Sequence, residues 1–164
     1  MLKCPAVRLT LAVSLLAVSS VSAQTNPRGE AKLELDGKSV TVEYGRPSLK
    51  GRDMLARAQP GQSWRLGADT ATTLETDAEL SFGSKMLAKG SYVLSAKKLE
   101  DGGWQLEVSS QGEDRKLVAE VPLQASELTE SVEMLTIELE AAEPSGVLSI
   151  KWGLNGLSAP FGVK

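Results

Sequence analysis

The sequence contains no histidine, and its single cysteine, Cys4, lies close to the N-terminus. Without histidine the chain lacks the usual general base and the commonest metal ligand, so a Ser-His-Asp triad is excluded. A cysteine nucleophile and a disulfide are also excluded from residues 24–164. We therefore expect no metal site and no cofactor, and we expect the fold to be held by its hydrophobic core.

Long apolar runs are scarce, and the run near the N-terminus is typical of an export signal. Lys3 and Arg8 precede the apolar segment 9–18, which is short for a bilayer span. The small residues that end at Ala23 fit a signal-peptidase site, so we predict a signal peptide over residues 1–23. An uncleaved anchor is disfavoured because no cluster of charges follows. We predict an exported protein, periplasmic or extracellular, without a membrane span after cleavage.

An excess of basic charge is also missing. The chain has 18 basic and 21 acidic residues, and removing Lys3 and Arg8 with the signal changes its net charge from −3 to −5. An acidic chain lacks the electrostatic footprint of a nucleic-acid binder, so we expect no nucleic-acid partner. Residues 24–164 suit a single domain that buries about 70% of its unfolded surface. The sequence does not fix an oligomeric state.

The remaining pattern is an alternation of apolar and polar residues, which predicts β-strands. Residues 33–35 and 40–44 alternate around Asp36-Gly37, which predicts a hairpin, and a second turn is expected at 101–103. Further alternation occurs in 92–96, 104–108, 117–121, 135–139, 148–152 and 157–163. Eight or nine short strands with one-sided alternation predict an all-β, antiparallel two-sheet β-sandwich over residues 24–164. Short helical turns are expected at 53–58, capped by Asp53, and at 126–130.

Two short segments, 44–52 and 64–73, hold most of the chemically distinctive side chains. Arginine suits bidentate recognition of carboxylate, phosphate or sulfate, and aromatic rings offer a stacking face for a sugar. We therefore predict a binding module for a small anion or an acidic sugar, in which both segments meet and their guanidinium groups converge. The candidate ligand-binding residues are Tyr44, Arg46, Ser48, Lys50, Arg52, Trp64, Arg65, Asp69 and Thr72.

Two other interpretations of these residues stay open. In the first, Asp69 accepts hydrogen bonds from the arginines and forms an internal ionic network that holds the loop between Tyr44 and Trp64. In the second, the chain is a hydrolase in which Ser48 is activated by Lys50, or in which Asp69 is the base. A Ser-x-Lys spacing arises often by chance, so we do not expect catalysis.

The two segments resemble the signature of the bacterial family called domain of unknown function 2911. The resemblance implies a secreted or periplasmic sandwich domain and brings no established activity. Asp69 stands where the family pattern has asparagine, and residues 58–61 replace a more apolar valine-proline-tyrosine-glycine stretch. The matching positions are Tyr44, Arg46-Pro47-Ser48, Lys50-Gly51-Arg52, Trp64-Arg65, Gly67-Ala68 and Ala71-Thr72-Thr73, with later echoes at Gly90-Ser91-Tyr92 and Trp152.

Overall fold

The computed structural model describes residues 25–164, and the predicted signal peptide lies outside this range. Residues 25–164 form strands, turns and loops, without an α-helix. No helix able to span a membrane is found among them. The strands are β1 (Arg28–Leu35), β2 (Lys38–Gly45), β3 (Ser63–Arg65), β4 (Thr72–Thr76), β5 (Leu80–Phe82), β6 (Lys85–Leu87), β7 (Gly90–Lys98), β8 (Trp104–Ser110), β9 (Leu117–Ala142) and β10 (Ser145–Val163).

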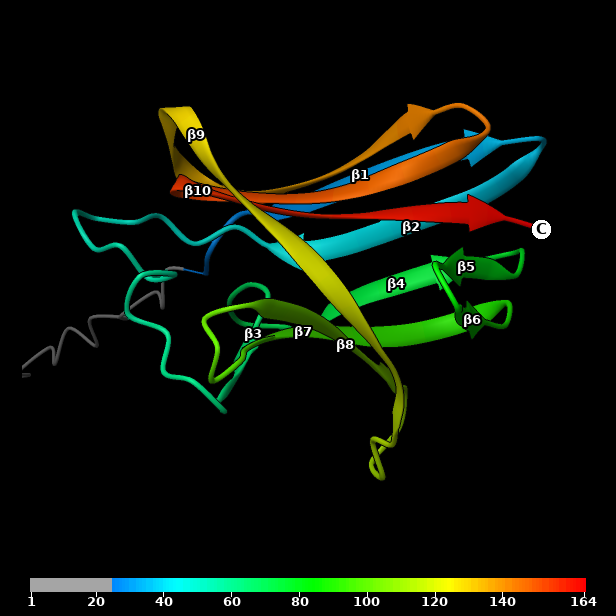
Figure 1. Ribbon diagram of the computed structural model, residues 1–164, viewed down its shortest axis with the longest axis horizontal. Coiled ribbons are helices and arrows are strands. Elements are labelled where there is room, and N and C mark those ends of the chain that lie inside the picture. The colour runs from blue at the N-terminus through cyan, green and yellow to red at the C-terminus, as the bar shows by residue number, and fades with distance from the viewer. Residues whose placement is uncertain (1–24) are drawn as a thin grey trace, which may run out of the picture.

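Antiparallel hydrogen bonding joins the strands into one continuous path. The order is β1-β2-β4-β7-β8-β9-β10-β5-β6, and β3 pairs with β7 beside β4. Figure 1 shows β9 running diagonally from β8 towards the layer that contains β1 and β10. The all-β antiparallel prediction is confirmed. A division into two separate sheets is not confirmed, because β9 pairs with β8 in one part and with β10 in another.

The two predicted hairpin turns are present. Leu35 pairs with Lys38, and the two residues between them have positive φ angles, 50° at Asp36 and 72° at Gly37. Two successive positive φ values match a type I′ turn, which suits the twist of a hairpin. The second turn joins β7 to β8 and includes Gly102 at φ 86°. Local turn chemistry therefore places both hairpins.

The helical turns predicted at 53–58 and 126–130 are absent. The Asp53 carboxylate accepts a hydrogen bond from the backbone N of Ala56 at 2.9 Å, as a cap would, but the chain forms only a single turn there. Residues 126–130 lie inside β9, where Ser126 pairs with Gly156 of β10. Pairing with a distant strand overrides the weak local tendency to form a helix.

Two strands are much longer than predicted. β9 joins the predicted strands 117–121 and 135–139, and β10 joins 148–152 and 157–163. The pairing of β10 with β9 shifts register on both sides of Gly153, which has φ 64°. A glycine with positive φ lets the strand bulge and bend without ending.

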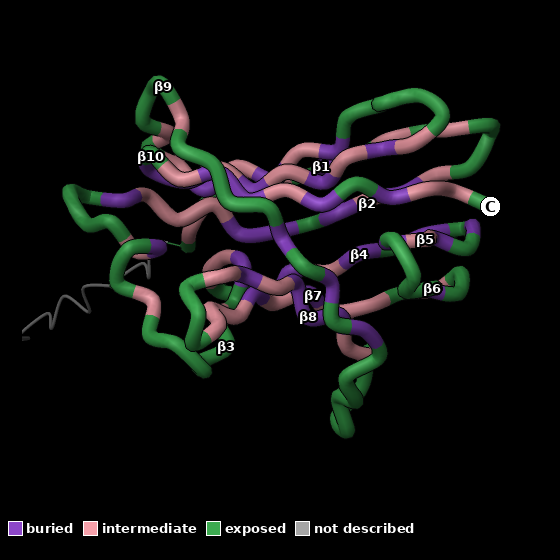
Figure 2. Tube along the Cα trace, in the orientation of Figure 1, coloured by how far each residue is buried: buried purple, intermediate pink, exposed green. Residues whose placement is uncertain are grey.

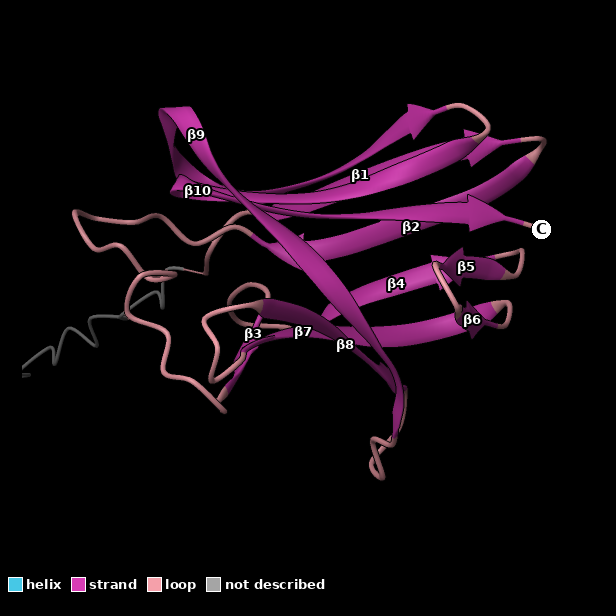
Figure 3. Cartoon of the chain, viewed as in Figure 1, coloured by secondary structure: helices cyan, strands magenta, loops and turns pink. Residues whose placement is uncertain are grey.

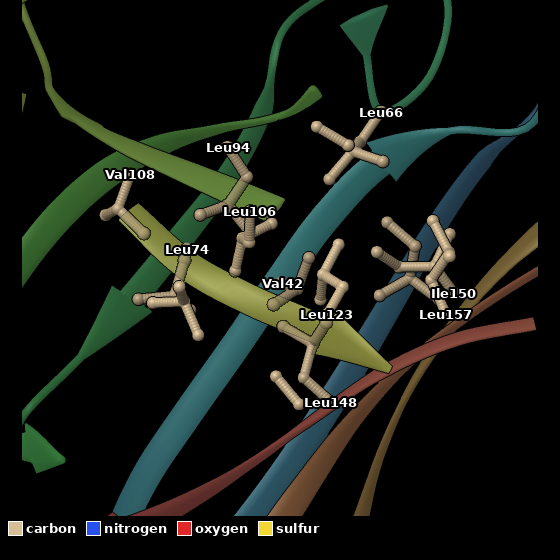
Figure 4. Packing of buried hydrophobic residues seen from close by; sticks show 14 of the residues in the cluster. Val42, Leu66, Leu74, Leu94, Leu106, Val108, Leu123, Leu148, Ile150 and Leu157 are labelled. Atoms are coloured by element: carbon tan, nitrogen blue, oxygen red, sulfur yellow. The ribbon is translucent and has the colours of Figure 1, made fainter. Parts of the chain in front are cut away.

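The core lies between the layers and is predominantly aliphatic. Figure 4 brings together Val42 of β2, Leu74 of β4, Leu106 of β8 and Leu148 of β10, all at most 1% exposed. Burial of such side chains is the main favourable term in folding, at about 25 cal/mol per Å². In Figure 2 exposed residues occur in the loops, which include the loop that follows β2, and along part of β9. The apolar face of each strand is buried in the core, so candidate site residues must come from the exposed positions.

Candidate functional site

The two predicted segments meet where β2 ends and β4 begins. A Cβ atom on Gly45 would lie 2.1 Å from the carbonyl oxygen of Ala68, and one on Gly67 would lie 2.9 Å from the carbonyl oxygen of Gly45. These approaches allow no side chain at either position. The buried hydroxyl of Thr72 donates to the carbonyl of Leu66 and closes the second loop. The loops that follow β2 and β3 are visible in Figure 3.

The side chain of Arg46 is bound to β9. Its Nε donates to the carbonyl of Leu135 at 3.2 Å, and its Nη2 donates to the hydroxyl of Thr136 at 3.2 Å. Its aliphatic stem lies over Gly29 of β1, where a Cβ would be 2.8 Å from Cδ of Arg46. Arg46 therefore joins the end of β2 to β9, and we remove it from the ligand site.

The rest of the first segment runs along β9. Ser48 forms a bridge with Met134, and the backbone N of Lys50 donates to the Glu133 carboxylate at 3.1 Å. Lys50 and Arg52 have exposed side chains. Within residues 25–164 no hydrogen bond connects the Ser48 hydroxyl with the Lys50 amine. The serine–lysine interpretation therefore gains no support from the geometry.

Two further candidates, Tyr44 and Thr72, are buried, and their hydroxyl groups bond within the protein. Tyr44 is 3% exposed, and its hydroxyl donates to the carbonyl of Ile137 at 3.1 Å. Thr72 is 2% exposed and uses its hydroxyl within the loop. Neither residue lines the cavity beside Trp64, although Thr72 borders a smaller cavity of about 200 Å³. The Tyr44 hydroxyl therefore joins β2 to β9, and the Thr72 hydroxyl closes the loop between β3 and β4.

Asp69 does not form the ionic network that we considered from sequence. Its Oδ2 accepts hydrogen bonds from Asn26, from the backbone N at 2.8 Å and from Nδ2 at 3.2 Å. Arg65 donates from Nη1 to the backbone carbonyl of Asp69 at 3.2 Å, rather than to its carboxylate. The ion pairs formed within residues 25–164 do not include Asp69. The Asp69 carboxylate therefore binds Asn26 near the start of the described chain. Arg65 forms no ion pair with a carboxylate within residues 25–164.

Trp64 is held in place by a second tryptophan. Its ring stacks on Trp152 with centroids 5.7 Å apart and an interplanar angle of 13°. Trp152 is 3% exposed, and its Nε1 donates to the carbonyl of Glu133 at 3.3 Å. Trp64 itself is half-buried. The stack fixes the orientation of the Trp64 indole, so a ligand that met it would meet a rigid surface.

A cavity of about 400 Å³ lies beside Trp64, within the range typical of small-molecule sites. Within residues 25–164, two charged residues line this cavity, Arg57 and Arg65. Gln59, Gln62 and Ser63 add amide and hydroxyl groups; the other lining residues are Met54, Ala58, Trp64 and Gly67. The cavity therefore combines two cations, neutral polar groups and an indole.

The predicted convergence of Arg46, Arg52 and Arg65 is not what the structure shows. Among the three, only Arg65 lines the cavity beside Trp64. The second arginine of the cavity is Arg57, which the sequence analysis did not predict as a site residue. Arg57 is the only basic residue in 53–63, the stretch between the two segments, and this position is the signal by which it could have been found.

These features define an all-β domain in which the loops that follow β2 and β3 meet, beside the Trp64 and Arg65 side chains of β3. The family model described as "Protein of unknown function (DUF2911)" matches residues 26–161, and the chain belongs to this family. The comparisons with curated proteins and with solved structures gave no match.

The backbone explains the residue type at position 69. Asp69 has φ 62°, in the left-handed region that only glycine, asparagine and aspartate adopt readily. The asparagine of the family pattern and the aspartate of this chain both meet that requirement. The exchange therefore preserves the loop conformation. Since the carboxylate bonds to Asn26, it does not occupy the cavity beside Trp64.

Proposed function

We propose that this protein is an exported binding module for a small acidic sugar, with its site in the cavity beside Trp64. The observation that carries the proposal is the lining of that cavity, in which Arg57 and Arg65 occur without a carboxylate among the described lining residues. Three other cavities on the described surface each contain at least one carboxylate. The cavity beside Trp64 therefore favours an anion more than these three cavities do.

The neutral groups of the cavity favour a sugar over a bare inorganic anion. Guanidinium groups donate paired hydrogen bonds to a carboxylate. The amides of Gln59 and Gln62 can both donate and accept, as sugar hydroxyls require. The indole of Trp64 offers an apolar surface for the face of a sugar ring. A uronate carries all three complementary features in one small molecule.

Isothermal titration calorimetry with galacturonate tests the proposal. Arg65→Gln and Arg57→Gln should each weaken binding roughly ten- to a hundredfold, because a hydrogen bond to a charged group contributes about 1.5–3 kcal/mol. Arg52→Gln is the matched control, since it removes an exposed arginine that does not line the cavity. Galactose, which lacks the carboxylate, should bind much more weakly.

Equal losses in all three arginine variants would indicate a nonspecific charge effect and would contradict the proposal. Absence of galacturonate binding to the unmodified protein would contradict it directly. Inorganic sulfate that bound as tightly as galacturonate would indicate a plain anion site without sugar recognition.

A further inference from the structure

A second cavity shares two lining residues with the first. Its volume is about 200 Å³, and Ser63 and Arg65 line both cavities. Arg115, from the loop between β8 and β9, lines the second cavity together with Ser95 and Ser109. No carboxylate occurs among its described lining residues. Arg65 therefore lies between two cavities, each of which adds a further arginine.

The second cavity lies over neighbouring strands of the sheet. The pairing of β3 with β7 sets Arg65 opposite Ser95, and the pairing of β7 with β8 sets Ser95 opposite Glu107. Figure 1 shows these three strands side by side. Residues directly opposite one another on paired strands point to the same face. Arg65, Ser95 and Glu107 therefore form one row across that face.

Glu107 determines what the serine hydroxyls can offer a ligand. Its Oε2 accepts hydrogen bonds from the hydroxyl of Ser63 at 2.6 Å and from that of Ser95 at 3.1 Å. A hydroxyl has one hydrogen and two lone pairs, so both serines can only accept hydrogen bonds from a ligand. Lys97 lies 4.0 Å from the other oxygen of Glu107 and provides a counter-charge.

The second cavity therefore requires a ligand that is both an anion and a hydrogen-bond donor. Arg65 and Arg115 donate hydrogen bonds to anionic oxygens, and Ser63 and Ser95 accept them from hydroxyl groups. An acidic sugar unit satisfies both requirements, as it does beside Trp64. Because Ser63 and Arg65 belong to both cavities, units bound in the two places would be neighbours.

We propose that the two cavities together bind one acidic oligosaccharide, with one uronate unit beside Arg57 and Trp64 and the next between Arg65 and Arg115. This inference rests on the proposed function and adds the length and polymeric nature of the ligand. Linking two units makes the second contact intramolecular, so a two-unit ligand gains affinity over a single unit.

Calorimetry with galacturonate and digalacturonate tests this inference through the ratio of their affinities. The unmodified protein should bind digalacturonate at least tenfold tighter. Arg115→Gln should bring the ratio close to one. Lys116→Gln should leave it unchanged; it removes the same charge from the same loop, but Lys116 does not line the second cavity. Both side chains are exposed, so both variants should keep the melting temperature of the unmodified protein.

A ratio near one in the unmodified protein would overturn the inference, as would a ratio that survives Arg115→Gln or that falls equally in Lys116→Gln. A Glu-Glu dipeptide that binds as tightly as digalacturonate would also overturn it, in favour of an acidic peptide. Galacturonate binding with no gain from a second unit refutes this inference alone. No binding of either sugar refutes the proposed function as well.

Discussion

Replacement of Arg46 by methionine separates the structural arginine of the motif from those that line the cavity. Methionine retains an unbranched apolar stem over Gly29 but cannot donate hydrogen bonds. The variant loses the bonds from Arg46 to the Leu135 carbonyl and to the Thr136 hydroxyl, each 3.2 Å long. These bonds join the end of β2 to β9, so their loss weakens the contact between these two strands.

The expected cost follows from the charge of the donor. A hydrogen bond from a charged group contributes about 1.5–3 kcal/mol, and bonds at the long end of the usual range belong near the lower figure. Two such bonds give a loss of about 3 kcal/mol in the free energy of unfolding. For a domain of this size, that loss corresponds to a fall of about 10 °C in the melting temperature.

Urea unfolding followed by tryptophan fluorescence measures this loss, since Trp104 and Trp152 are buried and report on the core. The midpoint should fall in Arg46→Met without a change in the slope m. Arg52→Met is the matched control; it alters an exposed side chain of the same loop and should change stability by no more than about 0.5 kcal/mol. Similar midpoints for the two variants would refute the structural role of Arg46.

Three further predictions follow from the backbone and from one ion pair. Gly45→Ala should lower the free energy of unfolding by about 1–3 kcal/mol or more, because the new Cβ would lie 2.1 Å from the backbone oxygen of Ala68. Asp69→Ala should cost about 1–2 kcal/mol at φ 62°, whereas Asp69→Asn should cost less. The Lys151 amine donates a hydrogen bond to the Glu138 carboxylate, which raises the pKa of Lys151 above 10.5. A raised pKa contributes stability below pH 10.5 that is lost as the pH rises through the folded-state value, so Lys151→Met should show a smaller alkaline loss.

Calorimetric melting measures the first two of these effects, and urea titration at several alkaline pH values measures the third. Gly162→Ala is a control for Gly45→Ala, since its Cβ would meet only the movable Ser81 hydroxyl, at 2.7 Å. Equal costs at the two glycines would contradict the backbone contact. Identical costs for the two Asp69 variants would contradict the role of its φ angle. Parallel alkaline profiles for Lys151→Met and the unmodified protein would contradict the assigned pKa direction.

The parts of the fold that depend on local chemistry could be predicted from the sequence. The β1–β2 hairpin follows from Asp36-Gly37, because two adjacent residues with positive φ determine the turn. The length of β9 could not be predicted in this way. Residues 124–131 are mostly exposed and polar, and they remain a strand because residues 124–127 pair with 155–158 of β10. Such pairing depends on the positions of distant segments.

The candidate site also combines features that follow from the local sequence with features that depend on distant residues. The sequence motif led to Trp64 and Arg65, and both line the cavity. The role of Arg46 could not be derived locally, since its partner Leu135 lies 89 residues away in the sequence. Arg115 carries no motif, and only the pairing of β3, β7 and β8 brings its loop near Arg65. Composition identifies the arginines, but tertiary structure decides which of them are available to a ligand.

A crystal structure of the protein with galacturonate tests the central claim most directly. We expect the carboxylate of the sugar to contact the guanidinium groups of Arg57 and Arg65, with the ring against the Trp64 indole. Galacturonate bound instead along residues 46–52, or at a carboxylate-lined cavity elsewhere, would contradict the assignment of the site.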